Sequence, residues 1–483
     1  MLCAISTYAN GPPERGRGMS ATVELETFVY RRPTRAVRRT LLGAAIVGAL
    51  AAVLATELPA QAGAAVTVNS VGSAGSVRSA ADAAGAASFG APAAAQGVAS
   101  RPILAPIAAA APAPNLTALK QSLQAVINAG SPGVFARVDD LSGTKVSTVS
   151  LGQGNIAAKT AVSPTGQFRV GSITKNFTAV LVLQLVGQKK VALDTVASKY
   201  LPAGVLPAGS PITVRELLNH TSGLYDYTND LLTGDTVTGY QKFRYLTYQP
   251  KTLVSMAVKH GSQFKPGSTY SYSNTNFVVL GMLVEKMTGL PYATALQQKI
   301  LTPLALTHTN FVVPKTTVPA AHAIGYLTQD VRTKPMFDAT NQTASWLWTA
   351  GALISTTADL NHYLRALATG KLLPAAQLTQ METMKAIDST SGYGLGMREY
   401  KLSCGINVYG HDGIIEGYQT YAYTTKDGTR QVTVSANASN NSNIFAAERQ
   451  VLNPVFCGVA APAAAQKLAT TDAGHVALEE SPR

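Results

Sequence analysis

The sequence has few cysteines, little charge and no long apolar run. Three cysteines occur in 483 residues, and no Cys/His cluster has the spacing of a metal site. Charged residues make up 13% of the chain and hydrophobic residues 46%, which is enough for a large core. No apolar run reaches the roughly 20 residues of a membrane span. We therefore expect no metal or other cofactor and no stable membrane anchor.

Acidic residues are the scarcer charged class, with 26 Asp and Glu against 39 Lys and Arg. The net charge of +13 fits nucleic-acid binding, but no basic stripe with interleaved aromatic residues is present. In an exported protein an anionic cell wall is a suitable partner, and a generally solvated surface explains the charge equally well. We predict no nucleic-acid partner.

The N-terminus has the three parts of an export signal. Five arginines lie within residues 31–39, Leu41–Ala55 is an apolar run of 15 residues, and Ala60-Gln61-Ala62 is an A-x-A cleavage site. Residues 38–42 also resemble a twin-arginine signal. A membrane anchor is the alternative, but the run is short for a span. We therefore expect a secreted, cell-wall-associated protein that is exported by the Sec or the twin-arginine route.

Composition divides the chain into four parts. Residues 1–62 are the export signal, and 63–113 are an Ala/Gly/Pro-rich linker or pro-segment that is too poor in large apolar groups to form a core. Residues 114–458 have the periodic apolar pattern of a folded domain, and 459–483 are a low-complexity tail.

Within the folded domain, strands at both ends enclose a mostly helical stretch. The pattern predicts helices at 115–129, after 172, and at 212–218, 277–287, 358–367 and 443–455, with strands at 133–139, 145–151, 406–409, 418–424 and 431–436. This order predicts an α/β (α+β) fold. One antiparallel sheet is built from both chain ends and flanked by helices, with an inserted, mostly helical lobe and a cleft where the two lobes meet.

Two cysteines remain once the signal, which contains Cys3, is removed. Cys404 and Cys457 would then lie in an oxidising compartment. Their number and location predict a disulfide between them.

An S-x-x-K motif occurs three times, at 142–145, 172–175 and 262–265. The first lies in a predicted hairpin turn and the last in a loop. Only Ser172 opens a long apolar helix, where a step of three places Lys175 on the same face and the helix dipole favours negative charge. Spacing alone leaves a solvated surface pair as an equal alternative.

Two further motifs fit the predicted cleft. Tyr272-Ser273-Asn274 precedes an apolar helix, and His411-Asp412-Gly413 lies at the start of the C-terminal strands. Each is weak alone, because a D-G pair is usually a turn and a lone histidine is more often structural.

Together and in this order, the motifs resemble those of the penicillin-binding, β-lactamase-like serine hydrolases of the class C type, above all the serine-type D-alanyl-D-alanine carboxypeptidases. The resemblance covers about 114–458 and includes FRVGSITK, ITVRELLNHTSGLYDYTND, YSYSNTNFVVLGMLVEKMTG, GYGLGM with the following Arg398, and LSCGINVYGHDG. It implies a β-lactamase/transpeptidase-like fold. It also implies a penicillin-binding D,D-peptidase that removes the terminal D-Ala from cell-wall peptides through an acyl-enzyme.

The resemblance also implies a role for each matched residue. Ser172 would be the nucleophile, Lys175 its base, and Tyr272 the proton donor to the leaving group. Asn274 would hydrogen-bond the substrate amide, and His411 would orient the proton network.

A second set of residues would bind the substrate. Arg398 would hold the terminal carboxylate, and the N–H groups of Ser172 and Ile414, the latter next to Gly413, would form the oxyanion hole. Trp346 would line the pocket, although an ordinary buried tryptophan is the alternative. Relatives have Thr where this chain has Asp412 and Ile414, so Asp412 would place a negative charge near Arg398, where an anion should bind.

Three functional hypotheses follow. The first is a D,D-peptidase acting on peptidoglycan stem peptides and β-lactams, expected to be a monomer. The second is an esterase, β-lactamase or D-amino-acid amidase on the same scaffold, which Asp412 favours. The third, a non-catalytic binder, is disfavoured because Ser172, Lys175, Tyr272 and Asn274 are all present.

Overall fold

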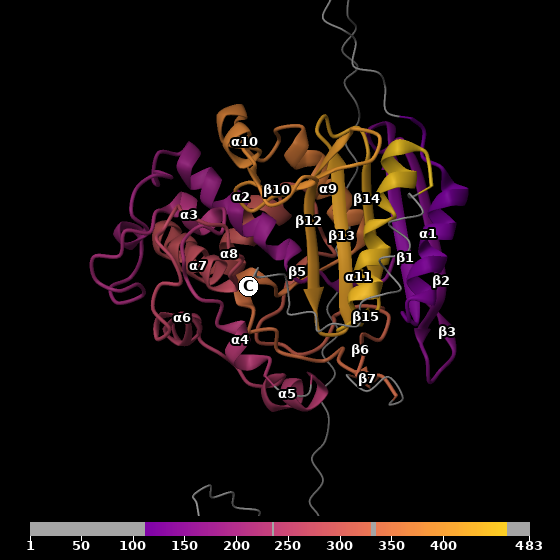
Figure 1. Cartoon of the computed structure of the whole chain (residues 1–483), viewed down its shortest axis with the longest axis horizontal. Coiled ribbons are helices and arrows are strands. Elements are labelled where there is room, and N and C mark those ends of the chain that lie inside the picture. The colour runs from indigo at the N-terminus through magenta and orange to yellow at the C-terminus, as the bar shows by residue number, and fades with distance from the viewer. Residues whose placement is uncertain (1–111, 234–235, 330–334, 461–483) are drawn as a thin grey trace, which may run out of the picture. The chain divides into compact units, whose positions relative to one another are not determined.

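Residues 112–460, except 234–235 and 330–334, are described by a computed structural model of the chain (Figure 1). The predicted export signal, nearly all of the predicted linker and most of the low-complexity tail lie outside these residues. Among the helices described, none is long and apolar enough to cross a membrane. The same residues contain no group of His, Cys, Asp and Glu side chains that could hold a metal ion.

The centre of the fold is a nine-stranded antiparallel sheet of order β3-β2-β1-β14-β13-β12-β11-β10-β9. Its strands are β1 (Gly133–Asp140), β2 (Lys145–Asn155), β3 (Thr160–Ala161), β9 (Lys385–Ala386), β10 (Ser391–Tyr393), β11 (Arg398–Lys401), β12 (Asn407–Ile415), β13 (Tyr418–Thr425) and β14 (Gln431–Ala436). β1 pairs with β14, so the indigo and golden strands of Figure 1 lie side by side. The predicted α/β fold, with a sheet built from both chain ends, is confirmed.

Helices cover both faces of this sheet. On one face, α1 (Leu116–Asn128) and α11 (Ser442–Arg449) pack on each other and on the sheet (Figure 1). On the other face lie α2 (Ile173–Gly187), against β12, and α9 (Thr357–Ala368), against β13 and β14. α2 is apolar on all sides because it is also covered by α7 of the helical lobe.

The inserted lobe is mostly helical, as predicted. Its helices are α3 (Val214–Leu218), α4 (Thr228–Leu231), α5 (Thr236–Phe243), α6 (Pro250–Val258), α7 (Asn274–Thr288) and α8 (Tyr292–Leu296), and α10 (Ala375–Met381) follows α9. Two three-stranded sheets add β4 (Phe168–Arg169), β8 (Leu353–Ser355) and β5 (Asn310–Phe311), and β15 (Ala438–Ser439), β6 (Tyr326–Leu327) and β7 (Phe337–Asp338). α7 packs on α2, α3 and α6, which joins the lobe to the sheet domain.

β12 is longer than the predicted strand at 406–409, and it contains the whole His411-Asp412-Gly413 motif. The two glycines in this stretch, Gly410 and Gly413, are sites of close backbone approach. A Cβ at Gly410 would collide with the carbonyl oxygen of Ala422, and one at Gly413 with that of Val170. Glycine therefore lets this strand lie close to its neighbours.

The prediction of one C-terminal helix over 443–455 is wrong. α11 ends at Arg449, and a separate π-helical turn spans Asn453–Cys457. Pro454 lies at the start of this turn, where its missing N–H is tolerated, whereas inside a continuous helix it would break a hydrogen bond.

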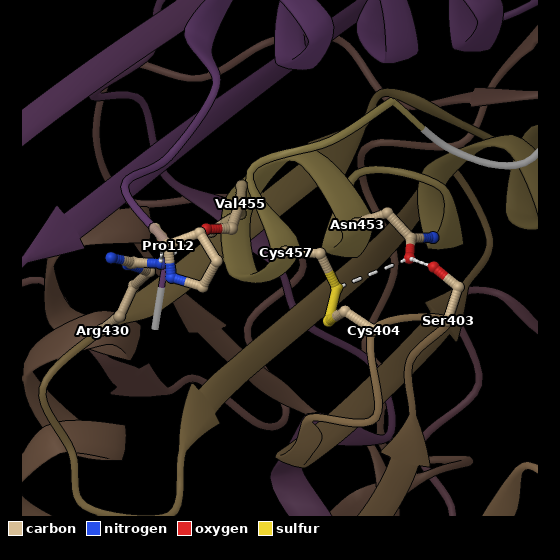
Figure 2. The surroundings of a disulfide bond; sticks show 7 residues. All are labelled: Pro112, Ser403, Cys404, Arg430, Asn453, Val455 and Cys457. Atoms are coloured by element: carbon tan, nitrogen blue, oxygen red, sulfur yellow. Dashed lines mark hydrogen bonds between the residues drawn. A yellow bond between two sulfur atoms is a disulfide. The ribbon is translucent and has the colours of Figure 1, made fainter. Parts of the chain in front are cut away.

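A disulfide joins this turn to the loop between β11 and β12, as predicted from Cys404 and Cys457 (Figure 2). Beside it, the Ser403 hydroxyl donates to Asn453 over 2.9 Å. The Arg430 guanidinium donates to the carbonyl oxygens of Pro112 and Val455 and to the Asp140 carboxylate. Both ends of the domain are thus fixed near the strands that carry Arg398 and His411.

Candidate active site

Ser172 lies at the first turn of α2, in a chain segment that is pressed against β12. Gly171 has a φ of +52°, and a Cβ there would lie 2.5 Å from the carbonyl oxygen of Ile414. Only glycine accepts both this conformation and this contact without strain. The turn places Ser172 next to the backbone of Gly413 and Ile414, the predicted second half of the oxyanion hole.

Two predicted catalytic groups lie within hydrogen-bond distance of the Ser172 hydroxyl. Lys175 Nζ is 2.7 Å from Ser172 Oγ, and the Tyr272 hydroxyl is 2.9 Å from it. All three side chains are buried. Tyr272 comes from the segment before α7, so this contact spans the junction of the two lobes. The structure therefore brings together Ser172, Lys175 and Tyr272 as the sequence predicted.

The ammonium group of Lys175 is surrounded by acceptors. Besides Ser172 Oγ, Nζ donates to Asn274 Oδ1 over 2.8 Å and to the carbonyl oxygen of Ala350 over 3.0 Å. As an ammonium, Nζ can donate to all three acceptors; as a neutral amine, it can keep the bonds to Asn274 and Ala350 while its lone pair accepts from Ser172. Nζ also lies 4.7 Å from the centre of the Tyr272 ring. No sequence pattern predicts the Ala350 contact, because any residue has a backbone carbonyl.

Asn274 is oriented by a buried carboxylate that sequence reasoning missed. Asp226 Oδ2 accepts from the Asn274 backbone N–H over 3.0 Å and from its Nδ2 over 2.9 Å. Thr228 fixes Asp226 in turn, through its N–H and hydroxyl. Because Nδ2 is held by Asp226, Asn274 Oδ1 faces Lys175. The predicted contact of Asn274 with a substrate amide stays a prediction.

His411 lies on the α2 face of β12, since the neighbouring alternate residues Tyr409 and Ile415 belong to the core on that side. Its Nε2 is 2.9 Å from the hydroxyl of Tyr393, and its Nδ1 contacts the carbonyl oxygen of Asp412. Burial, above all, lowers the pKa of His411 to about 3. His411 therefore contacts Tyr393, which lies in the matched GYGLGM stretch but had no assigned role. The predicted role of His411 in orienting the proton network stays a prediction.

Asp412 points to the opposite face of the sheet, toward the tyrosines of β11 and β13. Its Oδ1 accepts from the Tyr423 hydroxyl over 2.9 Å and lies 2.9 Å from Arg398 Nε. Burial by itself would raise the pKa of Asp412, but Arg398, His411 and the Tyr423 hydroxyl together hold this pKa below its usual value. The expected proximity of Asp412 to Arg398 is confirmed.

Trp346 is fully buried in the lobe. Its ring packs edge-on against Phe243 at 5.1 Å, and its Nε1 donates to Gln342 Oε1. These are the contacts of a core tryptophan, and the predicted role as a pocket wall stays a prediction.

A family model described as Beta-lactamase matches residues 122–453. The chain belongs to this family. Its fold and its active-site motifs are those of the β-lactamase/transpeptidase-like serine hydrolases.

Individual relatives in this family differ in activity. The chain is 37% identical to a D-stereospecific amidohydrolase from Streptomyces sp., with a TM-score of 0.65, covering 72% of this chain and all of that one. It is 26% identical to the D-amino acid amidase of Ochrobactrum anthropi SV3, with a TM-score of 0.61, and the match covers 71% of this chain and 96% of the amidase. It is 28% identical to penicillin-binding protein 4 of Amycolatopsis lactamdurans over 281 residues, covering 54% and 69%.

Proposed function

We propose that this protein hydrolyses amide or ester bonds of D-configured acyl groups through an acyl-enzyme on Ser172. The observation that carries the proposal is the convergence of Lys175 Nζ and the Tyr272 hydroxyl on Ser172 Oγ, at 2.7 and 2.9 Å. The preference for D-configured substrates is supported by the likeness to the Streptomyces amidohydrolase and the Ochrobactrum amidase.

The arrangement supports a two-step reaction. Ser172 Oγ attacks the carbonyl carbon while its proton passes to the neutral amine form of Lys175, and the N–H groups of Ser172 and Ile414 stabilise the oxyanion. Tyr272 donates a proton to the departing amine or alcohol and regains one from the protonated Lys175, so that the scissile bond breaks and an acyl-Ser172 ester is left. Water then attacks this ester and gives a proton to Lys175 or Tyr272, and these groups return a proton to Ser172 Oγ as the carboxylic acid leaves.

Asp412 points to the face of the sheet opposite Ser172, but it can still affect the choice of leaving group through its ion pair with Arg398. Asp412 Oδ1 lies 2.9 Å from Arg398 Nε. A terminal carboxylate of the substrate would therefore compete with Asp412 for the Arg398 guanidinium. An amide or ester whose leaving group has no charge avoids this competition. The pair therefore favours a D-amino-acid amidase or esterase.

A D,D-carboxypeptidase is the second candidate. Arg398 itself favours it, because this guanidinium matches the one expected to hold a terminal carboxylate, and so does the likeness to penicillin-binding protein 4. On this hypothesis the partners are peptidoglycan stem peptides and β-lactams. Export across the cytoplasmic membrane, proposed from residues 31–62, would place the protein where these partners occur.

The nucleophile is tested by covalent labelling. Incubation with penicillin should add one penicilloyl group to the peptide that contains Ser172, and Ser172→Ala should abolish it. Ser142→Ala and Ser262→Ala are matched controls, since both belong to S-x-x-K motifs, and they should label normally. A label on either of those serines would refute the assignment.

The substrate class is tested by rates on four compounds: a D-amino-acid amide, a p-nitrophenyl ester, a D-Ala-D-Ala peptide and a cephalosporin. The proposal expects kcat/KM for the amide or the ester to exceed that for the peptide by at least about tenfold, or about 1.4 kcal/mol. A preference for the D-Ala-D-Ala peptide would support the carboxypeptidase instead.

A further inference from the structure

Two buried histidines and a tyrosine form a hydrogen-bonded row behind Tyr272. Nε2 of His220 lies 3.2 Å from the hydroxyl oxygen of Tyr393, which lies 2.9 Å from Nε2 of His411. None of the three side chains is exposed. They come from separate parts of the fold, namely the turn after α3, strand β10 and strand β12.

One end of the row fixes the proton on His220. The backbone N–H of Ser273 donates to Nδ1 of His220 over 3.2 Å, and Nδ2 of Asn276 lies 3.1 Å from the same atom. A backbone N–H can only donate, so Nδ1 must accept. The neutral ring then has its proton on Nε2, which faces Tyr393.

The other end fixes the proton on His411 independently. Its Nδ1 lies within hydrogen-bond distance of the carbonyl oxygen of Asp412. A carbonyl can only accept, so Nδ1 of His411 holds the proton and Nε2 is the acceptor.

Tyr393 fits between these two ends. Its hydroxyl oxygen accepts from Nε2–H of His220, and its single proton is donated to Nε2 of His411. Every hydrogen bond therefore runs in one direction, from Ser273 to the Asp412 carbonyl. A further proton on Nδ1 of His220 would face the fixed N–H of Ser273, and one on Nε2 of His411 would deprive the Tyr393 hydroxyl proton of this acceptor.

Most charged groups around the row also favour neutral imidazoles. Lys175 of α2 and Arg398 of β11 add positive charge near it, whereas Asp412 of β12, on the opposite face of the sheet, adds negative charge; Tyr270 and Tyr272 are the other titratable neighbours. Burial, followed by Lys175, holds the pKa of His220 well below its usual value. For His411 burial dominates, and Asp412 only partly opposes it.

The row also touches the Tyr272 ring. The His220 ring stacks on it at a centroid distance of 4.2 Å and an interplanar angle of 29°. Lys175 Nζ lies 4.7 Å from the same ring. An imidazolium at His220 would thus add a second positive charge beside the phenol that donates to Ser172.

We propose that His220 and Tyr393 are positioning residues that hold His411 in its Nδ1–H tautomer and keep both imidazoles neutral beside Tyr272. Lys175 and Tyr272 are then the groups that exchange a proton with Ser172, without competition from either histidine. This inference rests on the proposed role of Ser172 as the nucleophile.

The tautomers are measured directly by nitrogen NMR of the full chain labelled in its seven histidines, with assignments from single histidine substitutions. His220 should be in the Nε2–H form and His411 in the Nδ1–H form, and neither should titrate between about pH 5 and 8, the range in which a free histidine does. The opposite tautomer at either ring, or a titration in this range, would overturn the proposal. This experiment needs no substrate.

Tyr393→Phe tests the consequence for catalysis. It keeps the ring and the burial of both imidazoles but removes the proton that His411 accepts, so the pKa of His411 should rise from its wild-type value while burial keeps it below that of a free histidine. At one pH unit below the His411 pKa measured for the variant, kcat/KM for the ester should be about tenfold lower than in the wild type, and near pH 8 within about twofold of it.

Tyr363→Phe is the matched control. This residue is also a buried tyrosine with a hydroxyl contact, to Asn176 over 2.7 Å, but it touches neither histidine. It should leave the shape of the pH profile unchanged. If both variants shift the acidic limb equally, or neither does, the positioning role is refuted. If the wild type instead hydrolyses none of the four compounds, the proposed function is refuted while the tautomers are still measured.

Discussion

Asp226 shows how one buried carboxylate fixes the orientation of an active-site amide. The backbone N–H and the Nδ2 group of Asn274 donate to Asp226 Oδ2 over 3.0 and 2.9 Å. Asn274 Oδ1 is left facing Lys175. Hydrogen bonds to a charged group contribute about 1.5–3 kcal/mol each. We therefore expect Asp226→Asn to lower the rate of Ser172 acylation by about 10- to 100-fold. Burst kinetics with the p-nitrophenyl ester would measure it.

Asp230→Asn controls for the loss of one negative charge nearby in the chain, in helix α4. Asp230 interacts with Tyr225 and His260 at the surface and has no contact with Asn274. Its acylation rate should stay near that of the wild type. Equal losses in the two variants would show that Asp226 acts only through the net charge or the fold of the loop.

Asp412 is the residue that separates the two candidate functions. Asp412→Thr removes the carboxylate that pairs with Arg398 and introduces the hydroxyl that the family resemblance implies at this position. Since the guanidinium would then be available to a terminal carboxylate, kcat/KM for a D-Ala-D-Ala peptide should rise by at least about tenfold, or about 1.4 kcal/mol, relative to a neutral ester. The peptide-to-ester ratio is the quantity to measure, because a general loss of stability affects both substrates.

Glu399→Gln is the control for this change. Glu399 is the neighbour of Arg398 in β11, and its carboxylate accepts from Asn407 over 2.7 Å. Removing its charge should leave the peptide-to-ester ratio unchanged. An unchanged ratio in Asp412→Thr would instead show that the ion pair does not select substrates.

At the scale of single residues, the sequence predicted the groups that carry chemistry but not those that hold them. Ser172, Lys175 and Tyr272 lie in motifs of fixed spacing, so they could be found without a structure. Asp226 and Tyr393 act through contacts with residues 48 and 18 positions away, which only the folded chain brings together. No local pattern marks such contacts.

Among the elements, the disulfide connects the β11–β12 loop to the C-terminal turn. The two cysteines are 53 positions apart, and closing a loop of this length stabilises the native state by about 4 kcal/mol in the chain-entropy model. Reduction should lower the free energy of unfolding by about this amount, measured by urea denaturation with and without reductant.

The double variant Cys404→Ser/Cys457→Ser separates this effect from other actions of the reductant. It should match the reduced wild type and should not respond to the reductant. Two free thiols in the denatured, unreduced protein would show that the disulfide is not formed in solution.

Elements defined by a regular pattern were predicted well, and those defined by packing were not. β14 was predicted with its observed ends, Gln431 and Ala436, because it alternates and follows a clear turn. β12 was predicted too short because Gly410 and Gly413 interrupt its apolar pattern. In the structure these glycines are needed where neighbouring backbone segments lie close to the strand. Helix α11 was predicted too long because the residues after Arg449 do not continue it. They lead instead into a separate π-helical turn that begins next to Pro454.

For the molecule as a whole, two kinds of buried group set how stability depends on pH. His411 is neutral in the folded state, with a pKa of about 3, whereas in the unfolded chain it takes up a proton below about 6.5. The unfolded state then binds more protons, so His411 lowers stability as the pH falls below that value. Glu416 acts in the opposite direction.

Glu416 is buried after β12, and burial raises the pKa of its carboxyl from 4.5 to about 7. Between these values the folded state keeps a proton that the unfolded state has lost, so stability falls as the pH rises, by about 3 kcal/mol in all. Glu416→Gln removes this dependence. The variant should exceed the wild type in free energy of unfolding by about 3 kcal/mol near pH 8, and by little near pH 4.

Urea denaturation at a series of pH values measures this difference, and Glu382→Gln is the matched control. Glu382 forms an ion pair with the exposed Lys426, with 3.5 Å between Nζ and Oε2, so its loss should change stability by less than about 1 kcal/mol at every pH. Both variants remove one carboxyl group. In Glu382 this group pairs with an exposed lysine, whereas in Glu416 it is buried after β12. Parallel pH curves for Glu416→Gln and the wild type would therefore show that the Glu416 carboxyl reaches water in the folded protein.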